Sequence, residues 1–455
     1  MLIAAVIAVI AMGAATLVQL DDGPSANAAP QPALGSLSSV VDQVGARELW
    51  NVGVTGEGVN VAVVDTGVAP VGALAERIVA AADFSPEQAD AATRYVDTNG
   101  HGTHLAGIIA GRSPGADPSD PASDDLLGVA PDAGIVSVKV ADRHGDVTVA
   151  QVVSGIDWVI AHADRLDIGV LTITIDAGEQ GTEAAAALDD AVARAWAAGI
   201  VVVTAAGNDG ATAGGINAPA RNPAVIAVGG LEATADGLVA ADWSTRGDAD
   251  RTPDIAAPGA HIVSLRAPGS DADVHHPEGL VDEVRFLGSG SSQSAAVAAG
   301  AAALLLSNDP TMTPDEVKAA LVASAVDVGA SAAAVGAGAL RVDAAADLDV
   351  TGATQDLVPA GARVDVGPAV GAMLVSPDWS SSTWSSSTWS SSTWSSSTWS
   401  SSTWSSSTWS SSTWSSSTWS SSTWSSSTWS SSTWSSSTWS SSTWSSSTWS
   451  SSTWS

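Results

Sequence analysis

A long apolar run that ends in an acidic residue sets the strongest limit on how this chain can fold. Residues 59–67 read VNVAVVDTG and are apolar almost without interruption up to Asp65. Runs of this kind form strands that are buried on both faces, as in parallel sheets. An aspartate at the carboxyl end of such a strand lies where α/β folds place their chemistry, although a simple turn cap is the alternative.

Strand and helix patterns alternate along the next part of the chain. We expect further strands at 135–140, 168–175, 201–209, 225–228 and 261–264. Helical patterns occupy 37–49, 149–163, 184–198 and 313–324, and residues 339–348 close the domain. Strands separated by helices indicate βαβ units, so the sequence predicts an α/β fold with a mostly parallel central sheet.

Two histidines lie at the start of a predicted helix. The segment NGHGTHLAG, residues 99–107, is a glycine-rich turn followed by apolar positions at helical spacing. His101 and His104 are three residues apart, but no acidic ligand follows at metalloprotease spacing, so we do not expect zinc here. A histidine at a helix start is often structural, and His101 becomes a candidate general base only together with an acid and a nucleophile.

A serine lies at the start of another helix. Residues 290–300, GSSQSAAVAAG, predict a tight turn that leads into an alanine-rich apolar helix with Ser292 in its first turn. Unpaired N–H groups and partial positive charge at a helix N-terminus stabilise a nearby anion. Taken alone, Ser292 is better explained as a helix cap. Its occurrence with Asp65 and His101 favours a nucleophile.

These residues provide the parts that acyl transfer requires. A serine hydroxyl is too weak an acid to attack a carbonyl unaided, so a histidine removes its proton and a carboxylate orients the histidine. The tetrahedral oxyanion needs preorganised donors. We expect these to be the side chain of Asn208, in the segment AAGND, and the backbone N–H of Ser292.

The four segments VVDTG, NGHGTHLAG, AAGND and GSSQSA resemble, in this order, the motifs of the subtilisin-like serine peptidases (subtilases, peptidase family S8). The resemblance covers roughly residues 40–348. It implies a three-layer α/β fold and a serine endopeptidase that works through an acyl-enzyme. It also implies a triad of Asp65, His101 and Ser292, with an oxyanion hole at Asn208 and Ser292.

The resemblance further implies substrate-binding positions. It places Asp97 beside the substrate cleft, and it places Thr174, Ile175 and Asp176 on the strand that backs the cleft. Family members usually carry glycine where Asp176 stands. A carboxylate there predicts a preference for Lys or Arg near the scissile bond. If Asp176 instead faces solvent, a broadly hydrophobic preference remains.

The serine motif departs from the family pattern at several positions. Threonine, methionine, alanine, proline and histidine are replaced here by Ser291, Gln293, Ser294, Ala296 and Val297. None of these changes removes a catalytic atom. They nevertheless motivate an alternative hypothesis, in which the protein is a catalytically impaired relative that acts as a binding protein.

The N-terminal residues indicate export. Residues 2–18 are almost entirely apolar, and Ala26-Asn27-Ala28 is a small-x-small cleavage pattern, so we expect a signal peptide at 1–28. An uncleaved membrane anchor is the alternative. A linker at 29–39 would then precede a peptidase domain at 40–348, with no folded inhibitory propeptide between them. We expect a secreted protein or one associated with the cell surface or cell wall.

A second linker, 349–378, leads to a WSSST repeat at 379–455. A tryptophan every five residues matches neither one face of a helix nor one face of a strand. The repeat also lacks the aliphatic residues needed for a core, so we expect a low-complexity disordered tail that forms a flexible, O-glycosylated stalk. The alternative is a multivalent surface for cell-wall polysaccharide, because indoles stack on sugar rings.

Composition excludes several classes of partner and cofactor. The formal net charge of −32 disfavours nucleic acid and anionic membranes, and the absence of cysteine excludes disulfides. The expected partners are protein or peptide substrates, and we expect a monomer. The chemistry requires no cofactor. Structural calcium is common in the family, but no loop identifies its ligands, and residues 267–285, with His275 and His276, are better explained as an exposed acidic insertion.

Overall fold

The computed structural model describes residues 35–120, 125–175, 182–212, 214–216, 218–235 and 237–355, together with short strands between 378 and 454. The expected signal peptide, most of both linkers and Asp176 lie outside these residues. The chain forms two compact units, Met1–Leu374 and Val375–Ser455. In the described part, no helix is both long enough and apolar enough to span a bilayer.

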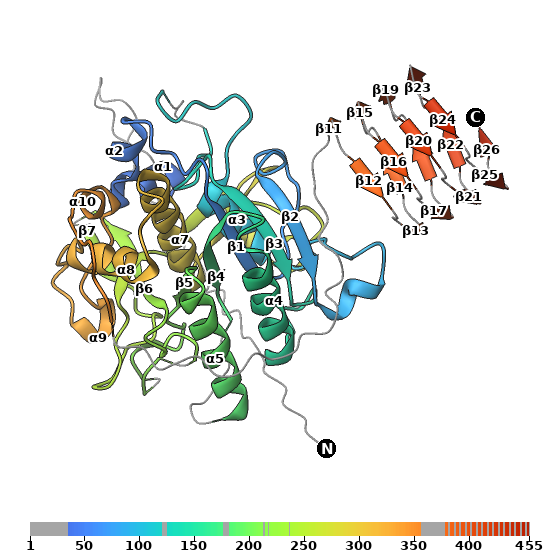
Figure 1. Ribbon diagram of the computed structural model, residues 1–455. Coiled ribbons are helices and arrows are strands. Elements are labelled where there is room, and N and C mark those ends of the chain that lie inside the picture. Colours follow the sequence, from blue (N-terminus) through green and yellow to red (C-terminus); the bar gives the residue numbers. More distant parts are fainter. Residues whose placement is uncertain are drawn as a thin grey trace. The chain divides into compact units, whose positions relative to one another are not determined.

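The first unit is built around one sheet (Figure 1), whose strands are β1 (Asn60–Asp65), β2 (Ile78–Asp83), β3 (Gly134–Lys139), β4 (Ile168–Ile173), β5 (Val201–Ala205), β6 (Ile226–Thr234), β7 (Gly237–Ala240) and β8 (Ile255–Pro258). The order is β2-β3-β1-β4-β5-β6-β7, and β8 also pairs with β6. All the pairs are parallel except β6 with β7. The mostly parallel sheet predicted from the sequence is therefore confirmed.

The helices are α1 (Leu37–Val44), α2 (Ala46–Trp50), α3 (His101–Ala110), α4 (Val149–His162), α5 (Glu183–Ala197), α6 (Asp271–His275), α7 (Ser291–Asn308), α8 (Pro314–Ala323), α9 (Ala332–Val335) and α10 (Val342–Ala346). Short 3-10 turns lie at η1 (Pro86–Ala89), η2 (Gly210–Thr212) and η3 (Pro277–Gly279). A separate antiparallel pair joins β9 (Ile262–Leu265) and β10 (Arg285–Gly288).

Both faces of the sheet are covered. Residues 61–65 of β1 are all buried, and neighbouring residues of a strand point to opposite faces. Helix α3 packs on α7, and α4 packs on α5 (Figure 1). Helix α7 is buried at every position from Ser291 to Leu306, which accounts for its small, apolar sequence. The result is the three-layer α/β fold expected from the resemblance.

Some element boundaries differ from the prediction. The helix expected at 37–49 is broken at Gly45, which adopts the left-handed conformation with φ 77°. Strand β4 ends at Ile173, and β5 ends at Ala205. Thr174, Ile175 and Asn208 therefore follow these strands instead of lying within them. Strand β2, IVAAAD, was not predicted because its alanines have weak strand preference.

The second unit consists of short parallel strands that recur every five residues. The first are β11 (Asp378–Ser380) and β12 (Thr383–Ser385), and the last is β26 (Thr453–Trp454). From β12 to β25 each strand has the sequence Thr-Trp-Ser. They form four sheets of four strands. In the first sheet Trp379 pairs with Trp399, which pairs with Trp419. This differs from the disordered tail expected from the repeat. Successive repeats contribute their strands to the four sheets in turn, so no single strand has to carry the five-residue period.

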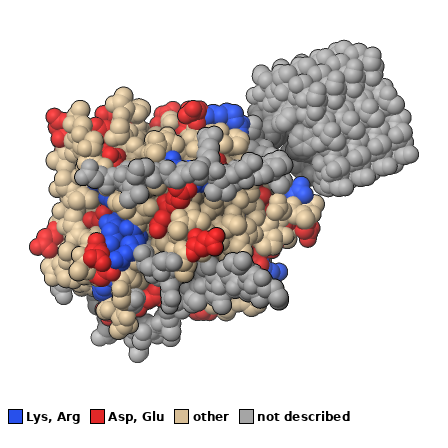
Figure 2. Space-filling model, turned by 60° about the horizontal axis from the view of Figure 1, so that its bottom comes forward, with Lys and Arg blue, Asp and Glu red and all other residues tan. Residues whose placement is uncertain are grey.

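Acidic groups are spread over the face of the first unit that Figure 2 draws. On the face drawn in Figure 2, Asp and Glu side chains lie among uncharged ones, and the described residues of that face carry no broad basic patch. This distribution agrees with the net charge of −32. A surface of this kind repels polyanions.

Candidate active site

Asp65 is held by a ring of donors at the carboxyl end of β1. The residue is 3% exposed. Its Oδ1 lies 2.8 Å from His101 Nδ1 and accepts a hydrogen bond from the Thr66 backbone N–H at 2.8 Å. Its Oδ2 accepts a hydrogen bond from Thr174 Oγ1 at 2.6 Å. The buried carboxylate is thus oriented by groups from three segments of the chain.

His101 is the first residue of α3, where it is placed by a glycine-rich turn. Gly100, the N-cap, has φ 105°, which residues with a side chain rarely adopt. Gly102 allows the Asp65 loop to approach, because a Cβ there would lie 2.1 Å from the Gly67 carbonyl oxygen. The glycine at position 102 is therefore required for steric reasons.

The charges of Asp65 and His101 stabilise one another. Burial alone would raise the pKa of Asp65, but His101 and the hydrogen bonds from Thr174 and Thr66 outweigh burial and lower it. Burial alone would lower the pKa of His101, but Asp65, and also the charge of Asp97, outweigh burial and raise it. An imidazole in this setting readily takes up a proton.

Ser292 differs from the other serines at the start of α7. Ser291 Oγ donates a hydrogen bond to Asn208 Oδ1 at 2.9 Å and accepts one from the Gly207 N–H at 3.2 Å. Ser294 is fully buried. Ser292 keeps 8% exposure, and its N-terminal position on α7 agrees with the prediction.

Asn208 is fixed beside the same turn. Its Oδ1 accepts hydrogen bonds from both the backbone N–H and the hydroxyl of Ser291. These two bonds use the amide oxygen and leave Nδ2 as the donor of the side chain. A Cβ built on Gly290 would lie 3.4 Å from Asn208 Nδ2. The donor therefore lies close to the chain that leads into Ser292.

Asp97 lies within the turn that precedes His101. It is 3% exposed, and its carboxylate accepts hydrogen bonds from Thr66 Oγ1 at 2.9 Å, the Gly100 N–H at 2.7 Å and both the N–H and Oγ1 of Thr103. Burial outweighs these bonds and raises its pKa. In this position Asp97 orders the His101 turn and the first turn of α3.

The remaining expected substrate-binding residues fall just beyond β4. Thr174 is half-buried, and its hydroxyl is bonded to Asp65. Ile175 is 8% exposed. Asp176 lies outside the described residues. The structure therefore brings Thr174 to the Asp65 carboxylate, a contact that the sequence pattern did not indicate.

His104 is buried behind His101, and its Nε2 lies 3.2 Å from the Phe286 carbonyl oxygen. Burial and the neighbouring His101 lower the pKa of His104 to about 4, so it is neutral at ordinary pH. In the described ranges, no group of three or more His, Cys, Asp or Glu residues could hold a metal ion.

Sequence reasoning missed the importance of Thr66. Its N–H bonds Asp65, and its hydroxyl donates to Asp97 and accepts from the Gly102 N–H at 3.0 Å. One residue thus connects the loop after Asp65 to both ends of the His101 turn. Its place directly after Asp65 in VVDTG was the available signal.

Comparison with known proteins assigns the chain to a family. The model of the subtilase family matches residues 56–339, more than half of the chain. The match covers most of the first unit, including its mostly parallel sheet. The chain belongs to the subtilase family.

The match with this chain covers only part of the length of each relative. Serine protease AprX of Bacillus subtilis (strain 168) is 40% identical over 276 residues, which are 58% of this chain and 60% of that protein. Minor extracellular protease Epr of the same organism is 31% identical over 289 residues, 64% of this chain and 38% of Epr. Subtilisin E is 32% identical over 293 residues, 64% of this chain and 66% of that protein.

Proposed function

We propose that this protein is an exported serine endopeptidase that hydrolyses peptide bonds in proteins or peptides. The observation that carries the proposal is the 2.8 Å contact between His101 Nδ1 and the buried Asp65 carboxylate. A histidine held in this way is oriented with Nε2 free to act as a base. Membership of the subtilase family and the names of the relatives support the same activity.

The proposed reaction begins at Ser292. His101 takes the hydroxyl proton at Nε2 while Oγ forms a bond to the substrate carbonyl carbon, and the Asp65 carboxylate stabilises the imidazolium. The oxyanion that forms accepts hydrogen bonds from Asn208 Nδ2 and the Ser292 N–H. Collapse breaks the C–N bond, and His101 gives its proton to the leaving amine. Water then adds to the acyl-enzyme with His101 as base, which releases the acid and restores Ser292.

Casein hydrolysis by wild type, Ser292→Ala and Ser294→Ala tests the proposal. Ser294 is a matched control because its buried hydroxyl has no hydrogen-bond partner among the described residues. We expect Ser292→Ala to lose hydrolysis and Ser294→Ala to keep it. An inactive wild type that is folded would favour the alternative, a catalytically impaired binding protein.

We propose a second role, polysaccharide binding, for the repeat. The observation that favours it is the in-register pairing of tryptophan positions, Trp379 with Trp399 and onward. Neighbouring strands of a sheet lie about 4.8 Å apart, so the pairing repeats the same residue type at short intervals. Repeated weak sites give avidity. Deleting residues 379–455 is expected to reduce retention on isolated cell walls while casein hydrolysis continues, and equal retention would contradict this role.

A further inference from the structure

The chain contains only two lysines, Lys139 and Lys318, and both are buried. Removing an ammonium group from water is costly unless its donors are bonded and its charge is paired. Each lysine must therefore have a set of oxygen partners. Those of Lys139 lie next to the triad.

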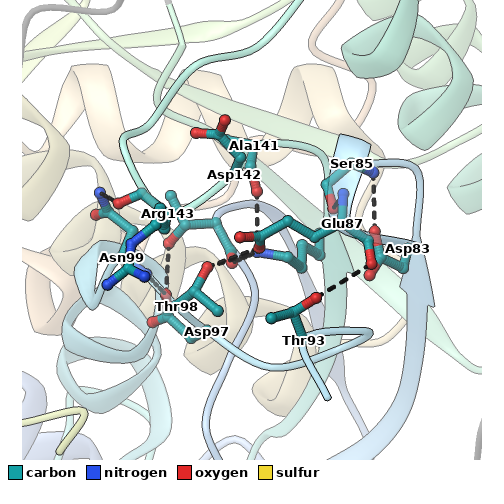
Figure 3. A network of polar contacts seen from close by, with 12 residues as sticks. Asp83, Ser85, Glu87, Thr93, Asp97, Thr98, Asn99, Ala141, Asp142 and Arg143 are labelled. Atoms are coloured by element: carbon teal, nitrogen blue, oxygen red, sulfur yellow. Dashed lines mark hydrogen bonds and ion pairs between the residues drawn. The ribbon is translucent and has the colours of Figure 1, made fainter. Parts of the chain in front are cut away.

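Lys139 ends β3, and its side chain has 0% exposure. Its Nζ donates hydrogen bonds at 2.9 Å to the carbonyl oxygens of Thr66 and Ala141. It also lies 3.3 Å from Thr98 Oγ1 and 3.0 Å from Glu87 Oε2. Figure 3 shows Glu87, Thr98 and Ala141 converging on this point from different segments. The ammonium fills a cage of four oxygens.

The cage joins the two loops that carry the acid and the base. In the backbone register of the parallel strands β1 and β3, Lys139 lies opposite Asp65. Thr66 follows Asp65 directly and bonds its carboxylate, while Thr98 lies in the turn that leads to His101. The Thr98 hydroxyl also donates to Glu87 Oε2 at 2.7 Å, which closes the cage. One cation thus connects the exit of β1 with the entry to α3.

We propose that Lys139 is a positioning residue for the Asp65–His101 pair. Its ammonium fixes the loop after Asp65 against the turn before His101. Lys139 and Glu87 also form an ion pair next to these two segments, in which the two charges cancel. This inference rests on the proposed function, because it concerns the same site.

The opposite charges of Lys139 and Glu87 predict the direction in which the pKa of His101 changes when either residue is replaced. The titratable groups that face His101 are Asp65, Asp97 and His104, and none of these is changed. Lys139→Met leaves the Glu87 carboxylate unbalanced, which favours the imidazolium and raises the pKa of His101. Glu87→Gln leaves the ammonium unbalanced and lowers that pKa. For a unit charge that acts on His101 through a partly polar interior, we expect a shift in this pKa of about 0.5 to 1 unit.

Lys318 is a matched control. Its Nζ donates to the carbonyl oxygens of Pro223 and Val225 at 2.9 and 2.8 Å and pairs with Asp254 Oδ1 at 3.1 Å. These partners precede β6 and β8, so they lie at the amino ends of the parallel strands. Thr66 and the segment that leads to His101 instead follow the carboxyl ends of β1 and β2. Lys318→Met therefore removes a similar buried ammonium from the opposite edge of the sheet.

The experiment is a pH titration of full-length wild type, Lys139→Met, Glu87→Gln, the double variant and Lys318→Met. Two measurements are made on each: kcat/KM on a chromogenic peptide amide, and the NMR titration of the His101 imidazole, assigned with His101→Ala. We expect the acidic limb and the NMR pKa to move up in Lys139→Met and down in Glu87→Gln. The double variant and Lys318→Met should stay within about 0.2 unit of wild type.

Unchanged titration of His101 in both single variants, or shifts of the same sign, would overturn the proposal. If Lys139→Met does not fold, Glu87→Gln decides the question, because it keeps the lysine. If the wild-type protein hydrolyses no substrate, the proposed function is refuted instead. The NMR titration of His101 would still test the role of Lys139.

Discussion

The hydroxyl of Thr174 offers a direct test of how the Asp65 carboxylate is held. It donates a 2.6 Å hydrogen bond to Asp65 Oδ2, while His101 and Thr66 bond the other oxygen. Thr174→Val keeps the side-chain shape and removes this donor from a carboxylate that is 3% exposed. Hydrogen bonds to charged groups contribute about 1.5 to 3 kcal/mol. If the whole loss appears in the transition state, kcat/KM falls about 10- to 150-fold.

Two other threonine variants make the test specific. Thr174→Ser keeps a hydroxyl at the same position and should restore most of the activity. Thr172 lies two residues earlier in the chain, and its buried Oγ1 has no hydrogen-bond partner in the described structure, so Thr172→Val should cost little. Rates are measured on a chromogenic peptide, with thermal unfolding as the stability control. Activity of Thr174→Val within twofold of wild type, or an equal loss in Thr172→Val, would refute the reasoning.

Four further predictions concern individual residues. His101→Ala and Ser292→Ala should each reduce kcat by about 10⁶ with circular dichroism unchanged, and residual activity within tenfold of wild type would contradict the triad. Asn208→Ala should lower kcat by about 10² to 10³ and spare KM, whereas a raised KM with unchanged kcat would exclude the oxyanion role. The pKa of His104 is about 4 in the folded protein against an ordinary 6.5, so the free energy of unfolding falls as pH drops from 6.5 to 4, by about 3 kcal/mol in total. Urea unfolding from pH 7 to 4 should show a smaller decrease in His104→Asn than in wild type. An equal decrease in both proteins would contradict this prediction. Asp176→Gly should weaken a preference for Lys or Arg in a peptide library, and an identical cleavage pattern would remove that hypothesis.

The sheet and the local structure around Asp65, His101 and Ser292 could be predicted because their signals are local. The apolar run before Asp65 and the glycines around His101 specify a buried strand and a turn from neighbouring residues alone. The start of α7 at Ser291 follows from the same kind of pattern. Each of these elements is consistent with its own sequence preference.

The rest depends on contacts between distant segments. Lys139 appears in the sequence as one lysine in an apolar strand, and only the fold brings Glu87 and Thr98 to its ammonium. The bond from Thr174 to Asp65 spans two different strand ends. The five-residue period of the repeat fits no single helix or strand, and its pairing becomes apparent only when Trp379 is beside Trp399.

Labelling with a fluorophosphonate probe, followed by mass spectrometry of the labelled peptide, tests the central claim most directly. The three serines near the start of α7 differ in the structure, since Ser291 is bonded to Asn208 and Ser294 is fully buried. We predict a single adduct on Ser292, absent in Ser292→Ala and formed far more slowly in His101→Ala. An adduct on Ser291 or Ser294, or labelling of His101→Ala at the wild-type rate, would contradict the account.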